Sequence, residues 1–115
     1  MAMGEIGTAI QAGLPTVTLV LNNGSWGAEK AYQRDFYRER YVGADVANPR
    51  FDEVARSFGI AGHRATRREE IQELIKDAIA QSTPTVIEVE IDPSSIQAFR
   101  KALFEEKRAG TAEAG

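Results

Sequence analysis

Leu21-Asn22-Asn23-Gly24-Ser25-Trp26-Gly27 is the stretch on which the fold of this chain depends, because it joins an apolar run over residues 16–21 to a helix-like segment that begins at Ala28. Open α/β sheets bind ligands at the carboxyl ends of their strands, which is where these small polar residues fall. Amide oxygens and inward-turned backbone carbonyls suit a hard cation such as Mg²⁺ or Ca²⁺ better than zinc. The stretch therefore predicts a buried strand followed by a ligand-binding loop.

A β-hairpin is the alternative interpretation of the same residues. The pair Asn23-Gly24 is a strong short-range indication of a two-residue hairpin turn. A hairpin needs a second strand after the turn, but residues 28–34 (AEKAYQR) are good helix formers without alternation. We therefore favour a strand, a loop and a helix over a hairpin.

Helix and strand patterns alternate along the rest of the chain. Apolar spacing, caps and breakers predict helices over 4–11, in part over 28–40, over 49–58 with Asn48 as the cap, over 66–79 with a capping box from Thr66 to Glu69, and from Ser94 onward. The predicted strands cover 16–21, 62–65 and 85–91. This order predicts an α/β fold, a partial doubly wound and mainly parallel sheet flanked by helices.

The two longer strand patterns predict different places in the sheet. Residues 16–21 lack alternation, which indicates burial on both faces and a central position. In residues 85–91 the apolar side chains alternate with Glu88 and Glu90, which indicates one buried face, one wet face and a place near the sheet edge. Both glutamates are then expected to face solvent without a partner.

Two groups of charged or titratable residues could carry chemistry. Lys30, Arg34 and Arg38 recur every four residues and would form a basic stripe along the predicted helix. A solvated face is the favoured interpretation of this stripe, and an anion site is the alternative. The only histidine, His63, has no nucleophile or carboxylate motif beside it, so we do not expect it to be catalytic.

Composition restricts the classes of function. The 115 residues suffice for one domain, and 43% hydrophobic content suffices for one core. A net charge of −3 argues against nucleic acid as a partner, and the absence of cysteine excludes disulfides and thiolate chemistry. No apolar run reaches membrane-spanning length and no secretory signal is recognisable, so we expect no membrane partner and a cytoplasmic location.

The pattern of residues also resembles a known family. Glu5-Ile6, Thr8-Ala9 and Leu14-Pro15 precede an apolar strand that ends in Asn22-Asn23. This order resembles the second half of the thiamine-diphosphate fingerprint of the acetolactate synthase-like enzymes, which begins with Gly-Asp-Gly and closes with an Asn-Asn pair. The resemblance continues through Asn48-Pro49-Arg50-Phe51, Phe58-Gly59 and residues 84–89, and so covers nearly the whole chain. It implies a thiamine-diphosphate-binding fold.

The resemblance implies a set of site residues and two cofactors, thiamine diphosphate and Mg²⁺. Asn23 would bind the metal through its side-chain oxygen and Ser25 through its backbone carbonyl. The residues expected to border the diphosphate are Asn22, Gly24, Trp26, Gly27 and Ala28. No catalytic residue is implied within this chain, because the glutamate that activates the cofactor in this family belongs to a different domain.

The resemblance also implies that residues 1–107 are the C-terminal portion of a cofactor-binding domain, truncated at its N-terminus. Residues 108–115 are small and polar, so we expect them to form a disordered tail. The Gly-Asp-Gly triplet, whose aspartate binds the metal in the family, does not occur in these 115 residues. We therefore expect the chain alone to be inactive. The parent enzyme is expected to act on a small-molecule substrate and to be a homo-oligomer.

Residues 26–30 (WGAEK), 35–37 (DFY) and 41–43 (YVG) most resemble the sulfoacetaldehyde acetyltransferases within this family. That resemblance implies cleavage or formation of a C–C or C–S bond next to a carbonyl, with sulfoacetaldehyde and phosphate giving acetyl phosphate and sulfite. The alternative is a non-catalytic α/β interaction module that keeps the fold without the chemistry. A doubly wound nucleotide binder is disfavoured, because no glycine-rich phosphate loop precedes the first helix.

Overall fold

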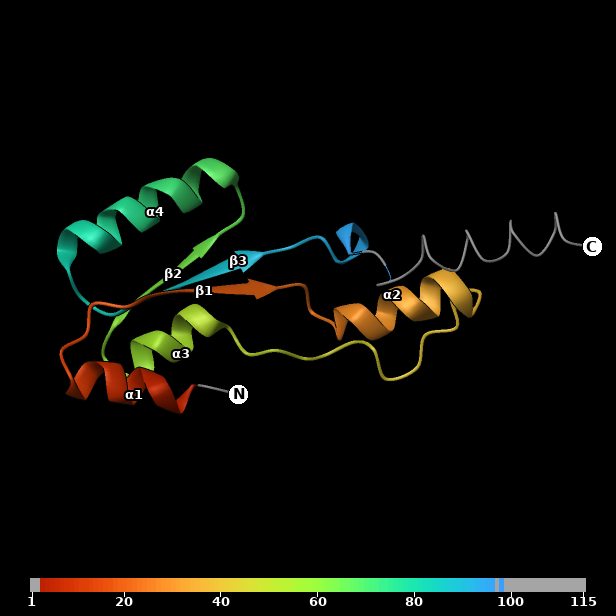
Figure 1. The fold of residues 1–115 in the computed structure, drawn as a ribbon, viewed down its shortest axis with the longest axis horizontal. Coiled ribbons are helices and arrows are strands. Elements are labelled where there is room, and N and C mark those ends of the chain that lie inside the picture. The colour runs from red at the N-terminus through yellow and green to blue at the C-terminus, as the bar shows by residue number, and fades with distance from the viewer. Residues whose placement is uncertain (1–2, 97, 99–115) are drawn as a thin grey trace, which may run out of the picture. The chain divides into compact units, whose positions relative to one another are not determined.

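The computed structural model describes residues 3–96 and residue 98. Its elements in chain order are α1 (Gly4–Gln11), β1 (Val17–Asn22), α2 (Gly27–Phe36), α3 (Phe51–Ser57), β2 (Ala61–Ala65), α4 (Arg68–Gln81), β3 (Thr85–Glu90) and the 3-10 turn η1 (Pro93–Ser95) (Figure 1). The described residues form two compact units. The sheet unit is drawn from Met1–Asn23 and Asn48–Ile91, and the α2 unit from Gly24–Ala47 and Asp92–Gly115.

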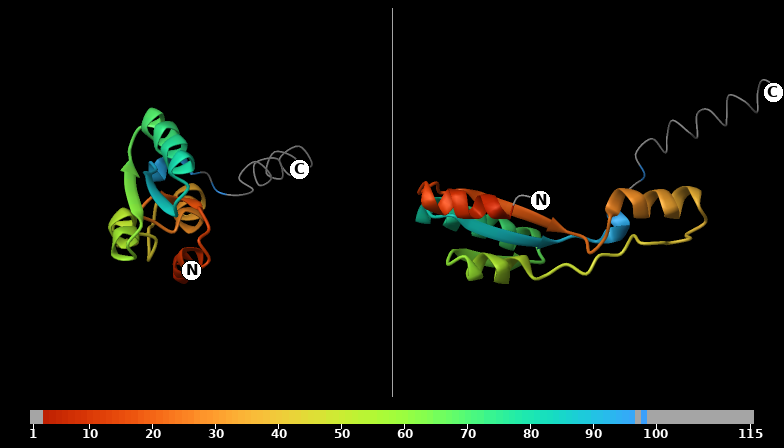
Figure 2. Two further views of the ribbon diagram at one scale, coloured as in Figure 1. Left: turned by 90° about the vertical axis from the view of Figure 1, so that its left-hand side faces the viewer. Right: turned by 90° about the horizontal axis from the view of Figure 1, so that it is seen from below.

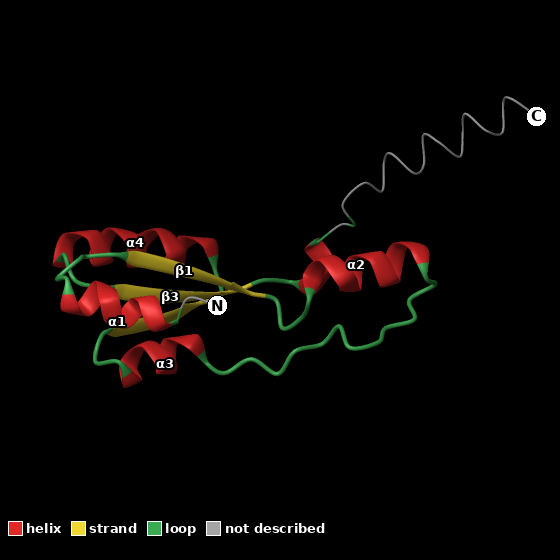
Figure 3. Ribbon diagram, turned by 60° about the horizontal axis from the view of Figure 1, so that its bottom comes forward, coloured by secondary structure: helices red, strands yellow, loops and turns green. Residues whose placement is uncertain are grey.

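The sheet unit contains three parallel strands in the order β1-β3-β2. The central strand β3 pairs in parallel with β1 and with β2, so all three strands run in the same direction. In this register Leu19 and His63 lie on either side of Ile87. Helices cover both faces: α4 lies on one face, and α1 and α3 lie on the other (Figure 2). The predicted α/β fold, with a parallel sheet flanked by helices, is confirmed, and the hairpin alternative is wrong because α2 follows the turn (Figure 3).

The predicted places of the two longer strands are wrong, and their roles are exchanged. The strand β3 is central and its residues Thr85–Val89 are all buried, although its sequence alternates between apolar and acidic side chains. Among the described strands β1 pairs with β3 alone, and Leu19 and Leu21 remain 43% and 66% exposed. The alternation of apolar and acidic residues in β3 predicted one exposed face. Helices cover both faces of β3, including the one that carries Glu88, so this prediction failed.

The hydrophobic core lies between the sheet and α4. Ala65 of β2 and the side chains of Ile87 and Val89 form its buried centre. Half-buried residues pack around this centre, and from α4 they are Ile71, Leu74 and Ile75. The predicted apolar face of this helix is confirmed for these three residues and for buried Ala78, but Ile79, which was predicted to continue it, is 66% exposed.

Some helix ends differ from the prediction for local reasons. The helix α3 begins at Phe51 instead of Pro49, because the Asn48 side chain donates to Asn22 and does not cap the helix. At the start of α4 the N-cap residue is Arg67, whose backbone N–H donates to the Glu70 carboxylate at 3.2 Å, so the capping box lies one residue later than predicted. The predicted helix after Ser94 is a 3-10 turn in the described residues, and residues 97 and 99–115 lie outside them.

The helix α3 packs on β2 at backbone distance. A Cβ atom on Gly62 would lie 2.1 Å from the carbonyl oxygen of Asp52 and 3.1 Å from the Cβ of Ala55. Atoms that are not bonded to each other do not approach so closely, so only glycine at position 62 allows α3 to pack where it does. This contact fixes the helix whose amino end faces the site described below.

The close contact at Gly62 predicts a large effect for the smallest substitution. Gly62→Ala should lower the free energy of unfolding by about 1–3 kcal/mol, because the new methyl group meets backbone atoms that cannot turn away. Gly7→Ala is the matched control, since nothing lies within 4 Å of the Cβ that it adds within α1. Urea denaturation followed by circular dichroism measures both variants, and equal stabilities would contradict the proposed packing.

The outer edge of β1 predicts association of the isolated chain. In the part of the chain that the structure describes, no strand pairs with the outer side of β1, and this side with exposed Leu19 and Leu21 forms an edge that recruits other strands. The 115-residue chain should therefore self-associate at micromolar concentration, as measured by light scattering coupled to size-exclusion chromatography. A sharp monomer peak with cooperative melting would show that the edge of β1 does not cause self-association.

Candidate functional site

The carboxyl end of β1 is held by side-chain hydrogen bonds within the sheet unit. Asn22, the last residue of the strand, donates from Nδ2 to Oε1 of Glu88 at 2.8 Å. Its Oδ1 accepts from Nδ2 of Asn48 at 2.9 Å, and its backbone carbonyl accepts from the N–H of Ile91 at 2.9 Å. The amide of Asn22 is therefore engaged at both ends, and its first role is to fix the strand end.

Glu88 is a buried member of this network, which contradicts the prediction that it faces solvent. Only 2% of the residue is exposed, and its Oε2 accepts from the backbone N–H of Phe51 at 2.9 Å and of Asp52 at 3.4 Å. Glu90 is exposed and forms an ion pair with Arg64 at 2.8 Å, so it is wet as predicted but has a partner. The one indication in the sequence was the β-branched run around Glu88, which is typical of a central strand.

Asp52 is a second buried acid, at the start of α3, and it is held differently. Its carboxylate contacts the guanidinium of Arg50 at 2.9 Å and that of Arg56 at 2.6 Å. The hydrogen bond from Arg50, followed by that from Arg56, holds the pKa of Asp52 far below its ordinary value. Arg56 also donates to the carbonyl of Gly62 at 2.9 Å, so this cluster ties α3 to β2.

The loop after β1 begins with Asn23, which is half-buried at the end of the sheet unit. Gly24 opens the α2 unit with a φ of 63°, a left-handed conformation that favours glycine. Within the α2 unit, Ser25 forms an isolated antiparallel bridge with Asp45. Sequence reasoning missed this pairing, because residues 41–47 show no strand pattern.

The hydrogen bonds of this bridge come from the neighbours of Ser25. The N–H of Trp26 donates to the carbonyl of Ala44 at 2.8 Å, and the N–H of Val46 donates to the carbonyl of Gly24 at 2.9 Å. In such a pair the carbonyl of the central residue points away from the opposite segment. The bridge thus directs the Ser25 carbonyl away from the segment around Asp45, which suits the metal-ligand role that the family resemblance implies.

Gly27 and Ala28 begin α2, with Trp26 as a cap residue that makes no side-chain cap hydrogen bond. The first turn of any helix leaves N–H groups without intrahelical acceptors, and the helix dipole makes that end positive. Small side chains at both positions keep this end accessible to a phosphate-bearing ligand. Trp26 itself is 56% exposed.

The predicted basic stripe is not a continuous face. Within the α2 unit, Lys30 pairs with Asp45 and lies 5.5 Å from the centre of the Tyr41 ring. Arg34 donates to Asp35 at 2.8 Å and to the carbonyl of Ile96 at 2.8 Å. The third residue of the stripe, Arg38, lies beyond the end of α2.

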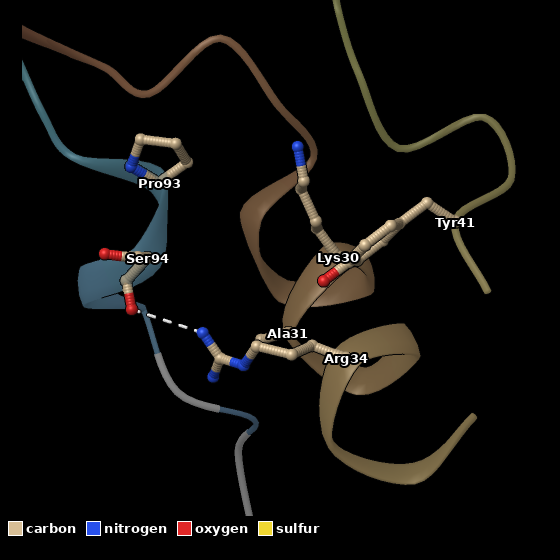
Figure 4. A pocket seen from close by; sticks show the side chains of 6 residues that line it. All are labelled: Lys30, Ala31, Arg34, Tyr41, Pro93 and Ser94. Atoms are coloured by element: carbon tan, nitrogen blue, oxygen red, sulfur yellow. Dashed lines mark hydrogen bonds between the residues drawn. The ribbon is translucent and has the colours of Figure 1, made fainter. Parts of the chain in front are cut away.

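Lys30 and Arg34 line a pocket of about 180 Å³ with Ala31, Tyr41, Pro93 and Ser94 (Figure 4). The carboxylates of Asp45 and Asp35 compensate both cations, so the pocket offers no excess positive charge for an anion. The two basic residues instead fasten α2 to the segments around Tyr41 and η1. The favoured solvated-face interpretation is therefore incomplete for Lys30 and Arg34.

The predicted site residues thus fall into two sets. Asn22 and Asn23 belong to the sheet unit, and Gly24 to Ala28 belong to the α2 unit. The surroundings of each set are therefore described within its own unit. His63 is half-buried on β2, and its lack of a catalytic role stays a prediction. Within the described residues, no three His, Cys, Asp or Glu side chains could hold a metal ion, and no helix could span a bilayer.

Comparison with known proteins gives a family match over most of the chain. The family described as "Thiamine pyrophosphate enzyme, C-terminal TPP binding domain" matches residues 1–89. The mitochondrial acetolactate synthase catalytic subunit of Saccharomyces cerevisiae is 35% identical over 92 residues, which cover 80% of this chain and 13% of the relative. The sulfoacetaldehyde acetyltransferase of Castellaniella defragrans is 38% identical over 93 residues, which cover 77% of this chain and 16% of the relative.

A third relative is the acetolactate synthase large subunit of Parasynechococcus marenigrum, which is 38% identical over 93 residues, covering 79% of this chain and 15% of the relative. The chain therefore spans less than a fifth of the length of each of these relatives. Relatives of two named activities show similar identity, so the level of identity does not separate them. All seven predicted site residues lie within the region that matches the family.

The ion pairs of Asp52 predict a pH dependence of stability. The pKa of Asp52 is lowered on folding, so its contribution is complete above the pKa of the unfolded chain, about 4, and is lost as the pH falls below that value. Asp52→Asn should lower the free energy of unfolding by about 1–3 kcal/mol at pH 7, and the difference from the unmodified chain should shrink between about pH 5 and pH 2. Urea denaturation across this pH range measures the difference.

Glu53→Gln is the control for this experiment, because Glu53 is the neighbouring acid and its side chain is 61% exposed. It should change stability little at any pH. A difference between the Asp52→Asn variant and the unmodified chain that stayed constant down to pH 2 would contradict the assigned ion pairs.

Proposed function

Because this chain belongs to the family of C-terminal thiamine pyrophosphate-binding domains of thiamine pyrophosphate enzymes, we propose that it supplies part of the metal- and diphosphate-binding site of an acetolactate synthase-like enzyme. The observation that carries the proposal is the loop after β1, in which an amide side chain, a backbone carbonyl directed away from its bridge partner and a helix amino end follow one another within six residues.

Asn23 and Ser25 are the proposed ligands of Mg²⁺. A side-chain amide oxygen and a backbone carbonyl are hard, neutral ligands of the kind that Mg²⁺ accepts beside phosphate oxygens. The bridge between Ser25 and Asp45 supports this role, because it fixes the backbone on which the carbonyl stands. No Gly-Asp-Gly triplet occurs in the chain, so the site as proposed needs a further acidic ligand from outside these residues.

Gly24, Trp26, Gly27 and Ala28 are the proposed neighbours of the diphosphate. The positive end of α2 and its first-turn N–H groups suit an anionic group, and two small residues let it approach the backbone. Asn22 is also proposed to border the diphosphate, because it directly precedes these residues in the chain. Its side-chain amide forms hydrogen bonds to Glu88 and Asn48. When bound, thiamine diphosphate would supply a means of stabilising negative charge that develops at the carbonyl carbon of the substrate.

The parent enzyme is proposed to act on a small carbonyl compound, making or breaking a C–C or C–S bond. A more specific version is the conversion of sulfoacetaldehyde and phosphate to acetyl phosphate and sulfite, supported by the likeness of residues 26–43 to the sulfoacetaldehyde acetyltransferases and by the relative from Castellaniella defragrans. The compensated charges of Lys30 and Arg34 lend no support to a substrate-anion site on α2. We also propose that the parent enzyme is a homo-oligomer.

The metal assignment predicts different results for two neighbouring residues. In the full-length enzyme that carries this domain, Asn23→Ala should weaken Mg²⁺-dependent binding of thiamine diphosphate by about 1–3 kcal/mol, because it removes a ligand to a charged group. Ser25→Ala is the matched control and should change binding little, since only the Ser25 backbone is used. Isothermal titration calorimetry with thiamine diphosphate at fixed Mg²⁺ measures both.

Two results would contradict the proposal. Equal losses in the two variants would mean that the ligand assignment is wrong. If the unmodified full-length protein bound no thiamine diphosphate at any Mg²⁺ concentration, the chain would instead be the non-catalytic interaction module.

A further inference from the structure

Glu88 is a charged residue in an unusual place. It lies on the central strand of the sheet, is 2% exposed, and faces α3. Its three hydrogen-bond donors are the Asn22 side chain and the backbone N–H groups of Phe51 and Asp52, so two separate segments converge on one carboxylate. A buried charge costs stability unless it is hydrogen-bonded, and an apolar residue of similar size often serves the core as well. The arrangement therefore calls for a role besides packing.

The carboxylate determines how the neighbouring amides are oriented. Both oxygens of Glu88 accept hydrogen bonds from N–H groups, so Asn22 turns its Nδ2 toward Glu88. The Oδ1 of Asn22 then faces outward and accepts from Asn48 at 2.9 Å. Glu88 thus fixes the direction of a chain of hydrogen bonds that runs from Asn48 through Asn22 to Glu88. We call these three residues the clasp.

The clasp lies where the chain enters and leaves the sheet unit. The chain leaves this unit after Asn23, returns at Asn48, and leaves again after Ile91. The clasp joins the point where the chain first leaves the sheet unit to the point where it returns. The N–H of Ile91 donates to the Asn22 carbonyl at 2.9 Å, and this bond ties the second exit of the chain to the same place. Asn23 follows the clasp directly, so its backbone starts from a point that these bonds hold.

We propose that Glu88 is a positioning residue, which acts through Asn22 to hold the strand end from which the metal ligand Asn23 follows. The proposal rests on the proposed function for the role of Asn23, but the clasp itself is a property of the sheet unit. The printed donors to Glu88 are the neutral N–H groups of Asn22, Phe51 and Asp52, so its hydrogen bonds hold the strand end without an ion pair between Glu88 and a basic side chain in the described residues.

The test replaces the carboxylate by its amide in the full-length enzyme. In Glu88→Gln the side chain keeps its size but can no longer accept hydrogen bonds with both ends, so the orientation of Asn22 is released. The Mg²⁺ concentration that half-saturates thiamine diphosphate binding should rise about 10-fold, as is typical when an outer partner of a metal ligand is lost. Hydrogen exchange measured without cofactor should speed up at the Ile91 N–H.

Glu90→Gln is the matched control, because it makes the same change on the same strand at an exposed ion pair with Arg64. It should leave both the Mg²⁺ requirement and the exchange at Ile91 unchanged. If Glu88→Gln does not fold, Glu88→Asp keeps the charge but withdraws the carboxylate by one methylene, and should shift both measurements in the same direction.

A double-mutant cycle distinguishes positioning from general stabilisation. If Glu88 acts through Asn22, then Glu88→Gln should add little to the rise in Mg²⁺ requirement already caused by Asn22→Ala. Fully additive effects would overturn the proposal, and so would unchanged exchange at Ile91 in Glu88→Gln. If the unmodified enzyme bound no thiamine diphosphate, the proposed function would fail, while faster exchange at Ile91 would still support the clasp.

Discussion

A buried carboxylate on the central strand imposes the strongest constraint on this structure. Glu88 has to receive hydrogen bonds, and within the described part of the chain its donors come from the end of β1 and from the start of α3. Those two segments are therefore held at the same edge of the sheet. The segment that follows β1 contains both predicted metal ligands and every predicted neighbour of the diphosphate except Asn22, and it begins from this fixed point.

The sheet unit contains two buried acids, and it satisfies them in opposite ways. Asp52 is paired with two guanidinium groups, which anchor α3 against β2 at the close contact with Gly62. Glu88 is satisfied by amides alone. The groups that donate to Glu88 are neutral N–H groups, whereas those that donate to Asp52 are charged guanidinium groups. The division places the cationic anchor on α3 and the neutral one next to Asn23.

Membership of the family and the length of the match set different limits on the function. The family match establishes a thiamine pyrophosphate-binding domain, and its physical counterpart is a parallel sheet with polar residues at a strand end. The choice between acetolactate and sulfoacetaldehyde chemistry depends on groups that contact the substrate. The chain spans 13% to 16% of the relatives described above, and its similar identity to relatives of both activities does not choose between them.

The sequence by itself determined the local elements. The apolar run before Asn22, the breakers Gly13 and Pro15, and the apolar face of α4 were enough to predict α1, β1, β3 and α4 and their order, because neighbouring residues decide these features. The strand-to-helix loop at Gly24 was predicted for the same reason. The resemblance to the family also depended on residue order alone.

Only the tertiary structure decided which polar groups are buried and which partners they have. Glu88 and Glu90 occupy equivalent positions in the alternating pattern, yet one is enclosed by α3 and the other is wet. The partners of Glu88 lie 66 residues away at Asn22 and 37 residues away at Phe51, so no local pattern reports them. A sequence pattern predicts that an acidic side chain is exposed to solvent. Whether a helix covers that side chain depends on how the whole fold packs.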